Sequence, residues 1–397
     1  MKITECETFV VGNPPPHFGG RYFLFVKLTT DDGIDGIGEA YVATFSPHVV
    51  AGMLSDAADR HLIGNSPFSI ETIWHRMFGT GYASRPDITL AGVMSALEMA
   101  CWDIVGKAVD KPVYQLLGGQ VHEALRSYTY LYPEPDDGAD VYIDPETAAR
   151  RAAEEVARGF TAVKFDPAGP YTVFDPHQPA VADLERSETM VKAVREAVGT
   201  RADILFGTHG QFSASGATRL ARRLEPYDPL WFEEPTPATN HREMAKVASQ
   251  TSIPIATGER LTTKHEFADV LMAQAASILQ PNLGRAGGIL EGKKIAALAE
   301  VHHAHIAPHL YCGPIVGAAN IQLATCSPNF LILEGIRDWS GFHAEILQTP
   351  VNWENGYVIP STEPGLGVIL NEEVALAHPY AGDDPHLKPS QDPYPWN

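Results

Sequence analysis

Five polar side chains and one glycine recur at nearly constant spacing in the second half of the chain. They are, in chain order, Gly207, Glu233, Glu259, Asn282, His309 and Glu334. The steps between them are 26, 26, 23, 27 and 25 residues, and each position follows a short apolar segment. Each step has the length of one strand plus one helix of a β/α barrel, in which the C-terminal strand ends form one rim that carries the catalytic groups. We therefore expect these positions to meet at one site.

Glu233 and Glu259 end apolar segments on adjacent predicted strands, in Trp231-Phe232-Glu233-Glu234-Pro235 and Ala256-Thr257-Gly258-Glu259-Arg260. Two carboxylates at one rim suit a hard cation such as Mg²⁺. The alternative is that both are solvated loop carboxylates, or that Glu259 forms an ion pair with Arg260.

Two histidines follow predicted strands. His309 lies among small and proline residues, where an imidazole can act as a general acid or base near neutral pH. His209 follows the strand that ends at Gly207, and it could donate a proton, bind substrate or bind a metal. The alternative for both is a structural role in a loop. We expect a structural or surface role for three upstream histidines, His302, His303 and His305.

Lys164 and Asp166 alternate on one predicted strand, so both side chains point to the same face. A buried Lys–Asp pair is unfavourable unless it faces a functional site, and a structural ion pair is the alternative. Glu334 ends the last predicted strand and could hydrogen-bond to a developing oxyanion. Its alternative is an ion pair with Arg337.

Short apolar strands alternate with helical stretches between residues 120 and 378. Strands of this kind indicate a parallel sheet that is buried on both faces. Residues 1–119 differ, with strands up to about residue 45 and helical stretches at 47–62 and 89–107. The sequence thus predicts an α/β protein with an N-terminal α+β domain at 1–119, a TIM-type (β/α) barrel at 120–378 and an extended C-terminal tail at 379–397.

Composition restricts the class of function. The 397 residues carry a net charge of −20, which argues against nucleic acid and anionic membranes as partners. The four cysteines form no CxxC pair, and the N-terminus has no long apolar segment. We therefore expect no disulfides, no signal peptide and a cytoplasmic location. The motifs of zincins, P-loop proteins, α/β-hydrolases and dinucleotide-binding folds are absent.

At these residues the chain resembles the enolase superfamily, in its mandelate racemase/muconate lactonizing branch, and most closely the acid-sugar dehydratases of the galactonate type. The barrel segments that carry the resemblance are Trp231–Pro235, Ile255–Leu261, Ile278–Asn282, Ala307–His309 and Gly365–Gly367. The N-terminal segments are Gly36–Glu39, Ala96–Asp103 and Leu116–Gly119. The resemblance covers nearly the whole chain.

The resemblance implies a metal site. In that family the N-terminal domain caps a modified barrel and selects the substrate, and the barrel rim holds Mg²⁺, with Mn²⁺ as an alternative. Glu233 and Glu259 would be metal ligands. The family's third ligand, an Asp, belongs at Gly207, which has no side chain. Since Mg²⁺ prefers six oxygen ligands, we expect Asp166, or else His209, to supply the third contact.

The resemblance also implies acid–base roles. His309 would act as general acid or base, Glu334 would assist at the substrate carboxylate, and His209 would help a hydroxyl leave. The acid that usually orients the catalytic histidine belongs at Asn282, and Lys164-Phe165-Asp166 stands where racemases and several dehydratases carry Lys-x-Lys. We expect substrate contacts from N-terminal loops and the rim, at His17, Tyr82, Arg85 and Tyr311.

The predicted function is a Mg²⁺-dependent dehydratase of an aldonate or aldarate, which forms an enediolate by α-proton abstraction and yields a 2-keto-3-deoxy acid. The first alternative is a racemase, epimerase or cycloisomerase acting on a related hydroxy acid, with Lys164 opposite His309. The second is a catalytically weakened barrel that binds a sugar acid, for which Gly207 and Asn282 are the evidence. We expect a small-molecule substrate and a homo-oligomer.

Overall fold

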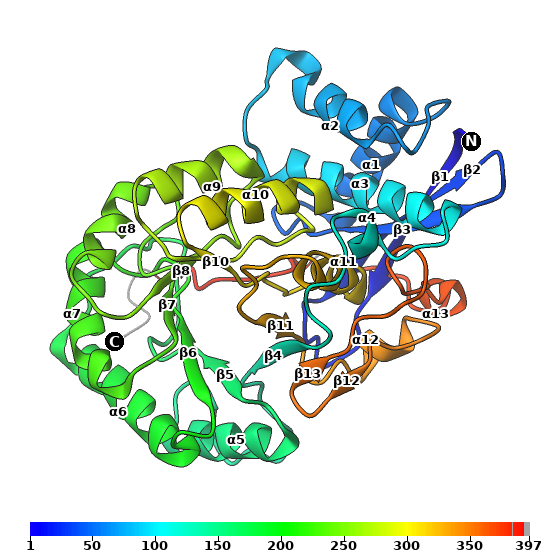
Figure 1. The fold of residues 1–397 in the computed structure, drawn as a ribbon. Helices are drawn as coiled ribbons and strands as arrows, with labels where there is room; N and C mark the ends of the chain where they lie inside the picture. The colour runs from blue at the N-terminus through cyan, green and yellow to red at the C-terminus, as the bar shows by residue number, and fades with distance from the viewer. Residues whose placement is uncertain (383, 393–397) are drawn as a thin grey trace.

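The computed structural model describes residues 1–382 and 384–392, so the end of the tail predicted at 379–397 lies outside the described residues. Figure 1 shows a first unit built on an antiparallel sheet with the order β1-β2-β3. Its strands are β1 (Ile3–Gly12), β2 (Tyr22–Thr30) and β3 (Asp35–Ala40). Its helices are α1 (Pro47–His61), α2 (Ile70–Gly79) and α3 (Ile88–Ala108). The strands and the two helices expected here are confirmed, and α2 is additional.

Helix α3 lies directly against β3 because two glycines leave room for it. A Cβ on Gly38 would lie 1.9 Å from the carbonyl oxygen of Ala96, and one on Gly36 would lie 2.2 Å from that of Ala100. The helix has the length and hydropathy of a membrane span, but most of it is buried inside the protein. A helix that is apolar on all sides is the form expected for a core helix.

The second unit is a parallel barrel. Its strands run in sequence order from β4 to β10, and β11 pairs with β4. They are β4 (Leu125–Tyr130), β5 (Ala162–Phe165), β6 (Asp203–Gly207), β7 (Trp231–Glu233), β8 (Ile255–Thr257), β9 (Ile278–Leu279), β10 (His305–Ile306) and β11 (Leu333–Gly335). A single parallel bridge, between Ile306 and Phe330, spans the seam between β10 and β11. The predicted α/β barrel fold is confirmed.

Helices surround the barrel (Figure 1), and buried side chains fill it. The helices are α5 (Pro145–Arg158), α6 (Val181–Val198), α7 (Ala214–Leu224), α8 (His241–Ala248), α9 (Thr263–Met272), α10 (Ile289–Val301) and α11 (Pro314–Thr325). The short helix α4 (Val113–Leu116) lies beside α3 and precedes the barrel (Figure 1). Beneath the rim, one residue from each strand or its flank forms a buried cluster: Tyr128, Ala162, Leu205, Trp231, Ala256, Ile278, Ala307 and Ile332. This filling makes the barrel a packed core with its chemistry at the rim.

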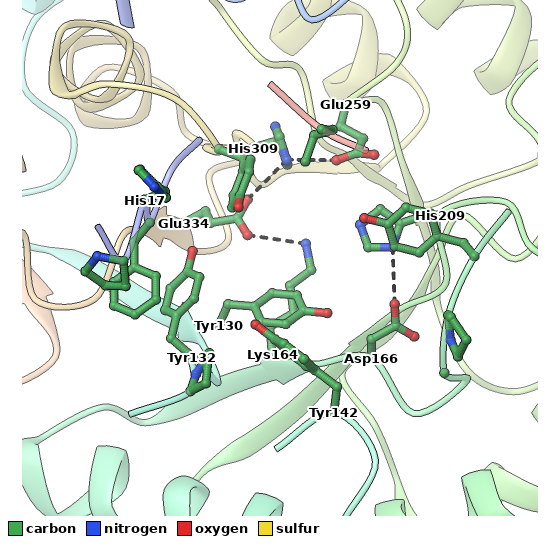
Figure 2. Close-up of a pocket in the computed structure, with 18 of the residues that line it drawn as sticks. His17, Tyr130, Tyr132, Tyr142, Lys164, Asp166, His209, Glu259, His309 and Glu334 are labelled. Carbon is green, nitrogen blue, oxygen red and sulfur yellow. Dashed lines mark hydrogen bonds and ion pairs between the residues drawn. The ribbon is translucent and has the colours of Figure 1, made fainter. Parts of the chain in front are cut away.

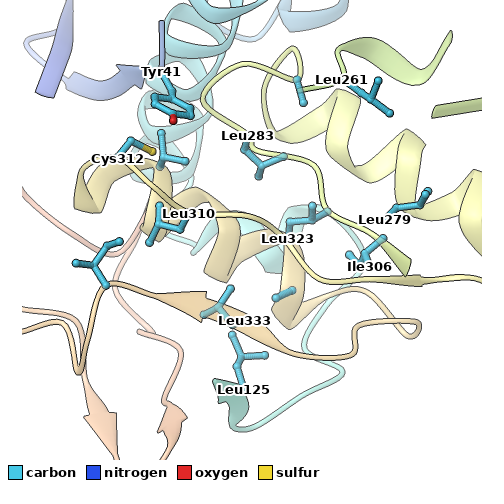
Figure 3. Close-up of a cluster of buried hydrophobic side chains, with 14 of the residues drawn as sticks. Tyr41, Leu125, Leu261, Leu279, Leu283, Ile306, Leu310, Cys312, Leu323 and Leu333 are labelled. Atoms are coloured by element: carbon cyan, nitrogen blue, oxygen red, sulfur yellow. The ribbon is translucent and has the colours of Figure 1, made fainter. Parts of the chain in front are cut away.

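The chain after β11 returns to the first unit through α12 (Phe342–Glu345), β12 (Trp353–Glu354), β13 (Tyr357–Val358) and α13 (Glu372–Ala377). Buried Asp103 of α3 accepts hydrogen bonds from the backbone N–H groups of Ile37 at 3.0 Å and Leu366 at 2.8 Å. Figure 3 shows Tyr41 of the first unit within the same apolar cluster as Leu125 and Leu333 of the barrel. One apolar cluster therefore spans the two units, and each unit also has a buried cluster of its own.

The described part of the tail crosses from the first unit to the barrel. Pro379 pairs with Val11 of β1, and Ser390 pairs with Thr172 in the loop after β5. His386, between these contacts, is buried. The described tail therefore packs on its own chain, with one contact at β1 and another at the loop after β5.

Candidate active site

A cavity of about 470 Å³ opens at the C-terminal ends of the barrel strands (Figure 2). Its wall combines side chains of the first unit, the barrel rim and the tail, which contributes Leu387. Many residues expected at the site line it: His17, Lys164, Asp166, His209, Glu259, His309, Tyr311 and Glu334. The barrel therefore gathers side chains that the regular spacing predicted to meet.

Four expected residues do not line the cavity. Glu233 and Asn282 are buried next to the lining residues Lys164 and His309, whereas Tyr82 and Arg85 lie away from the cavity. Tyr82 is fully exposed, and Arg85 is exposed in the loop before α3. Gly81, with a φ of 68°, turns the chain just before Tyr82 in the short helix η1 (Thr80–Tyr82). The first unit reaches the cavity instead through the loop between β1 and β2, which supplies His17 and Phe18.

Lys164 ends in an ammonium group held by two buried carboxylates. Its Nζ lies 2.7 Å from Glu233 Oε1 and 3.3 Å from Glu334 Oε1. Burial opposes the charge, but Glu233, Glu334 and Glu259 raise the pKa of Lys164 above its usual value. Two of the three N–H donors of the ammonium are thus engaged. The alternative pairing of Lys164 with Asp166 does not form.

The second oxygen of Glu233 is also engaged. Oε2 accepts hydrogen bonds from Gln280 Nε2 at 2.8 Å and from Trp231 Nε1 at 3.1 Å. Glu233 is buried, so these donors satisfy a carboxylate that water does not reach. Sequence reasoning missed Gln280, although it lies two residues before Asn282, just after β9.

These contacts do not suit a magnesium site. Mg²⁺ needs near-octahedral oxygen ligands, whereas Glu233 is hydrogen-bonded through both oxygens and Gly207 offers no side chain. Asp166, the expected third ligand, pairs with a histidine. Among the residues that the structure describes, no group of three or more His, Cys, Asp or Glu side chains could hold a metal ion. The side chains present therefore do not fit the divalent cation that the resemblance implies.

His309 lies between Glu259 and Asn282. Its Nε2 is 2.7 Å from Glu259 Oε2, and Asn282 Nδ2 donates to its Nδ1 at 3.0 Å. The amide orientation is fixed because Asn282 Oδ1 accepts a hydrogen bond from the backbone N–H of Gly284 at 2.8 Å. An imidazole nitrogen that accepts carries no proton. The ring proton therefore lies on Nε2 and points to Glu259.

Glu259 is a charged partner for His309. Burial opposes its ionisation, but His309, His209 and Arg260 hold the pKa of Glu259 well below its usual range. The alternative ion pair with Arg260 is a long one, because Arg260 Nε lies 3.9 Å from Glu259 Oε1. Arg260 Nη2 lies 2.5 Å from Glu234, a buried carboxylate for which no role was expected.

His209 forms a second pair, with Asp166. Its Nδ1 lies 3.3 Å from Asp166 Oδ2. The loop that presents His209 is fixed by the hydroxyl of Thr208, which donates to the carbonyl oxygen of Glu233 at 3.0 Å. Burial disfavours a charged ring, but the Asp166 contact and the charge of Glu259 raise the pKa of His209 to about 9. His209 is therefore protonated at neutral pH.

Glu334 is fixed beside the Lys164 ammonium. Its Oε2 accepts a hydrogen bond from the backbone N–H of Leu310 at 2.8 Å. The alternative pairing with Arg337 does not form, because Arg337 lies 2.7 Å from Glu134. Both oxygens of Glu334 thus have defined partners at the cavity wall.

Tyrosines form much of the remaining wall: Tyr41, Tyr130, Tyr132, Tyr142, Tyr171 and Tyr311. Burial raises the pKa of Tyr130 and of Tyr132 well above the usual value, so both hydroxyls keep their protons. A neutral phenol can donate and accept hydrogen bonds, and its ring offers an apolar face. Only Tyr311 was expected from the sequence.

Two family models match the chain. Residues 147–374 match the enolase C-terminal domain-like family. Residues 18–118 match the N-terminal domain of mandelate racemase / muconate lactonizing enzyme. The matches fall on the barrel and on the first unit.

Individual relatives match along nearly the whole chain. The chain is 34% identical over 385 residues to D-galactonate dehydratase of Verminephrobacter eiseniae, with 95% of this chain and 94% of that protein covered. It is 33% identical over 393 residues to D-xylonate dehydratase of Haloferax volcanii, with 96% and 90% covered. A crystal structure from Labrenzia alexandrii, assigned to the mandelate racemase/muconate lactonizing enzymes, has 64% identity and a TM-score of 0.97 over 99% of each chain.

Proposed function

The chain belongs to the enolase superfamily, with both domains of the mandelate racemase / muconate lactonizing enzymes, and on this basis we propose that it dehydrates an aldonate or aldarate. Its relatives named as dehydratases support an enzyme of the lyase type. Dehydratases of this superfamily generally depend on a divalent metal ion. Because the rim does not fit such an ion, the steps below use only the protein's own side chains.

One observation carries the proposal: two histidine–carboxylate pairs, His309–Glu259 and His209–Asp166, line one cavity (Figure 2). His209 follows β6 and His309 follows β10, and these strands are four positions apart in the sheet order. Dehydration needs a base for the proton beside the carboxylate and an acid for the departing hydroxyl. His209 carries a raised pKa, whereas His309 has its ring proton on Nε2 only. Two groups in such different environments can divide the roles of acid and base.

His209 is the acid of the proposed reaction. Its contact with Asp166 and the charge of Glu259 raise the pKa of His209 to about 9, so the ring is protonated at neutral pH. A protonated imidazole can give its proton to a hydroxyl as the C–O bond breaks, so the group leaves as water rather than as hydroxide.

His309 and Glu259 form the base of the proposed reaction. In the resting site Nε2 carries a proton along the 2.7 Å contact to Glu259. For Nε2 to accept the proton from C2, its own proton must pass to Glu259. The two side chains therefore act as one acid–base unit, in which Asn282 holds the ring in this protonation pattern.

The proposed reaction balances without an added reactant. The C2 proton moves to the His309–Glu259 pair, and the C–H electrons form an enediolate with the carboxylate. The enediolate then expels the C3 hydroxyl, which takes the proton of His209 and leaves as water. The resulting enol gains a proton at C3 and becomes the 2-keto-3-deoxy acid.

The cavity wall supports a polyhydroxy substrate. Several protonated tyrosine hydroxyls, with those of Tyr130 and Tyr132 among them, can exchange hydrogen bonds with the hydroxyls of a sugar acid. Their ring faces can pack on its C–H groups. Specificity would arise where the first unit meets the barrel, at His17 and Tyr311.

The geometry favours this proposal over the two alternatives. An epimerase would need a proton-transfer group at Lys164 opposite His309, but the Lys164 ammonium is ion-paired to Glu233 and Glu334. A binding protein without activity would not need two histidine–carboxylate pairs at one cavity.

A screen of sugar acids tests the proposal. The purified protein is incubated with aldonates and aldarates, with MgCl₂ or with EDTA, and 2-keto products are measured. We expect a 2-keto-3-deoxy acid from at least one sugar acid and none with His309→Asn, whose folding is checked by thermal unfolding. Product from the His309→Asn protein at the parent rate would exclude His309 from the reaction.

A further inference from the structure

Gly207 and Lys164 share the part of the rim where the resemblance places the third metal ligand. A Cβ on Gly207 would lie 3.4 Å from Lys164 Cε and 4.0 Å from Glu233 Oε1. The Cβ itself would make an ordinary van der Waals contact with the end of Lys164, and it would also lie 3.7 Å from His209 Cε1. The further atoms of an Asp at 207 would compete with the lysine for the space beside Glu233.

The Lys164 ammonium has the surroundings of a bound cation. The side chain is 2% exposed, and Nζ contacts two carboxylates, those of Glu233 and Glu334. It also lies 5.8 Å from the ring centre of Tyr130, within cation–π range. Because Lys164 lines the cavity, its third N–H donor is available to a substrate.

We propose that this ammonium takes the place of the divalent cation, so that the enzyme stabilises its enediolate without a bound metal ion. The inference rests on the proposed dehydration for its chemistry. The structural basis of the inference is the position of the Lys164 ammonium beside Glu233, which does not depend on which substrate binds.

Lys164 would act as a fixed positive charge and hydrogen-bond donor. When the C2 proton moves to the His309–Glu259 pair, negative charge develops on the carboxylate oxygens of the substrate. The free N–H of Lys164 can donate to one of these oxygens, and a donor aimed at developing charge in a buried site lowers the barrier. Lys164 keeps its proton throughout, and no electron acceptor or donor is required.

A metal-binding experiment on the unmodified protein tests the inference directly. The protein is dialysed against EDTA and then against metal-free buffer. Metal content is measured, and MnCl₂ is titrated with detection of free Mn²⁺ by electron paramagnetic resonance. We expect no stoichiometric Mn²⁺ binding and no rise of the unfolding temperature with MgCl₂ or MnCl₂, since only a ligand that binds the folded state raises it.

Two double variants test whether the space of the Lys164 ammonium can be turned into a metal site, one as the test and the other as its matched control. Lys164→Met with Gly207→Asp replaces the ammonium by a carboxylate, and Lys164→Met with Gly207→Asn differs from it only by one charged group. We expect stoichiometric Mn²⁺ binding to the first variant and much weaker binding to the second. A folded first variant that binds no Mn²⁺ would show that this part of the rim is not a cation position.

The Mn²⁺ measurement on the unmodified protein tests the inference even if the double variants do not fold. Stoichiometric Mn²⁺ in the parent that is lost in Glu233→Gln would overturn it. The proposed function fails separately, if no sugar acid is dehydrated with or without EDTA while the metal measurements come out as expected. Dehydration that EDTA leaves unchanged supports both proposals.

Discussion

The charge of His209 depends on two neighbouring carboxylates, those of Asp166 and Glu259. Asp166 lies 3.3 Å from the imidazole ring, and this contact and the charge of Glu259 raise the pKa of His209 to about 9 against the effect of burial. An acid must be protonated to act, so we expect the turnover rate to fall as the pH rises through about 9.

Replacing Asp166 by Asn should move this fall to lower pH. The amide keeps the shape of the side chain but removes the charge that favours the imidazolium. The pH–rate profile is compared with that of Asp140→Asn, which changes another carboxylate of the same cavity. An unchanged pH–rate profile in Asp166→Asn would show that His209 is not the acid whose titration controls the rate.

Asn282 determines which nitrogen of His309 carries the proton. In Asn282→Asp, the carboxylate can accept a hydrogen bond from Nδ1 and still accept one from Gly284, so that the proton can move from Nε2 to Nδ1. We expect the pH–rate profile to move to higher pH, because a carboxylate also stabilises the charged ring. The thermal unfolding temperature serves as the control for folding.

The types of the rim residues were predictable from the sequence, but their pairing was not. Regular spacing placed Glu259 and His309 at one rim, and His209 follows the strand that ends at Gly207 in the same series. Spacing cannot show that Lys164 turns to Glu233 rather than to Asp166, because side-chain direction depends on burial and on neighbouring strands. The expected metal ligand set of Glu233, Glu259 and Asp166 was inferred from spacing, from the oxygen preference of Mg²⁺ and from the family resemblance, and the contacts of these side chains do not match it.

At the scale of elements, the contact between β3 and α3 depends on glycine. We expect Gly38→Ala to lower the free energy of unfolding by about 3 kcal/mol or more, because its Cβ would lie 1.9 Å from the carbonyl oxygen of Ala96. Gly52→Ala is the matched control. It lies inside α1 with no atom within 4 Å of its Cβ, and alanine there should stabilise the helix by roughly 0.5–1 kcal/mol. Equal effects in urea unfolding would contradict the close packing.

Strand β4 shows where sequence patterns fail. Its segment Leu125–Tyr130 contains the polar residues Arg126, Ser127 and Thr129, so it lacks the continuous apolar run that is typical of a buried parallel strand. Antiparallel pairing of β13 with part of β4 adds a contact that is remote in sequence. The rim tyrosine Tyr130 was missed together with its strand.

At the scale of the whole molecule, the tail joins the first unit to the barrel and places Leu387 in the cavity wall. We expect Leu387→Ala to raise KM by roughly fivefold, which corresponds to about 1 kcal/mol of lost apolar contact, with little change in kcat. Leu376→Ala, on the exposed face of α13, is the control. If the KM of Leu387→Ala equals that of Leu376→Ala, the tail does not contribute to substrate binding.

Dehydration in D₂O tests the central claim most directly. The sugar acid that the screen identifies is converted in D₂O, and the product is analysed by proton NMR and mass spectrometry. The account predicts a 2-keto-3-deoxy acid with one solvent-derived deuterium at C3, because the enol takes its new hydrogen from solvent. Recovery of the substrate with deuterium at C2 and inverted configuration, without a 2-keto product, would contradict it and identify an epimerase.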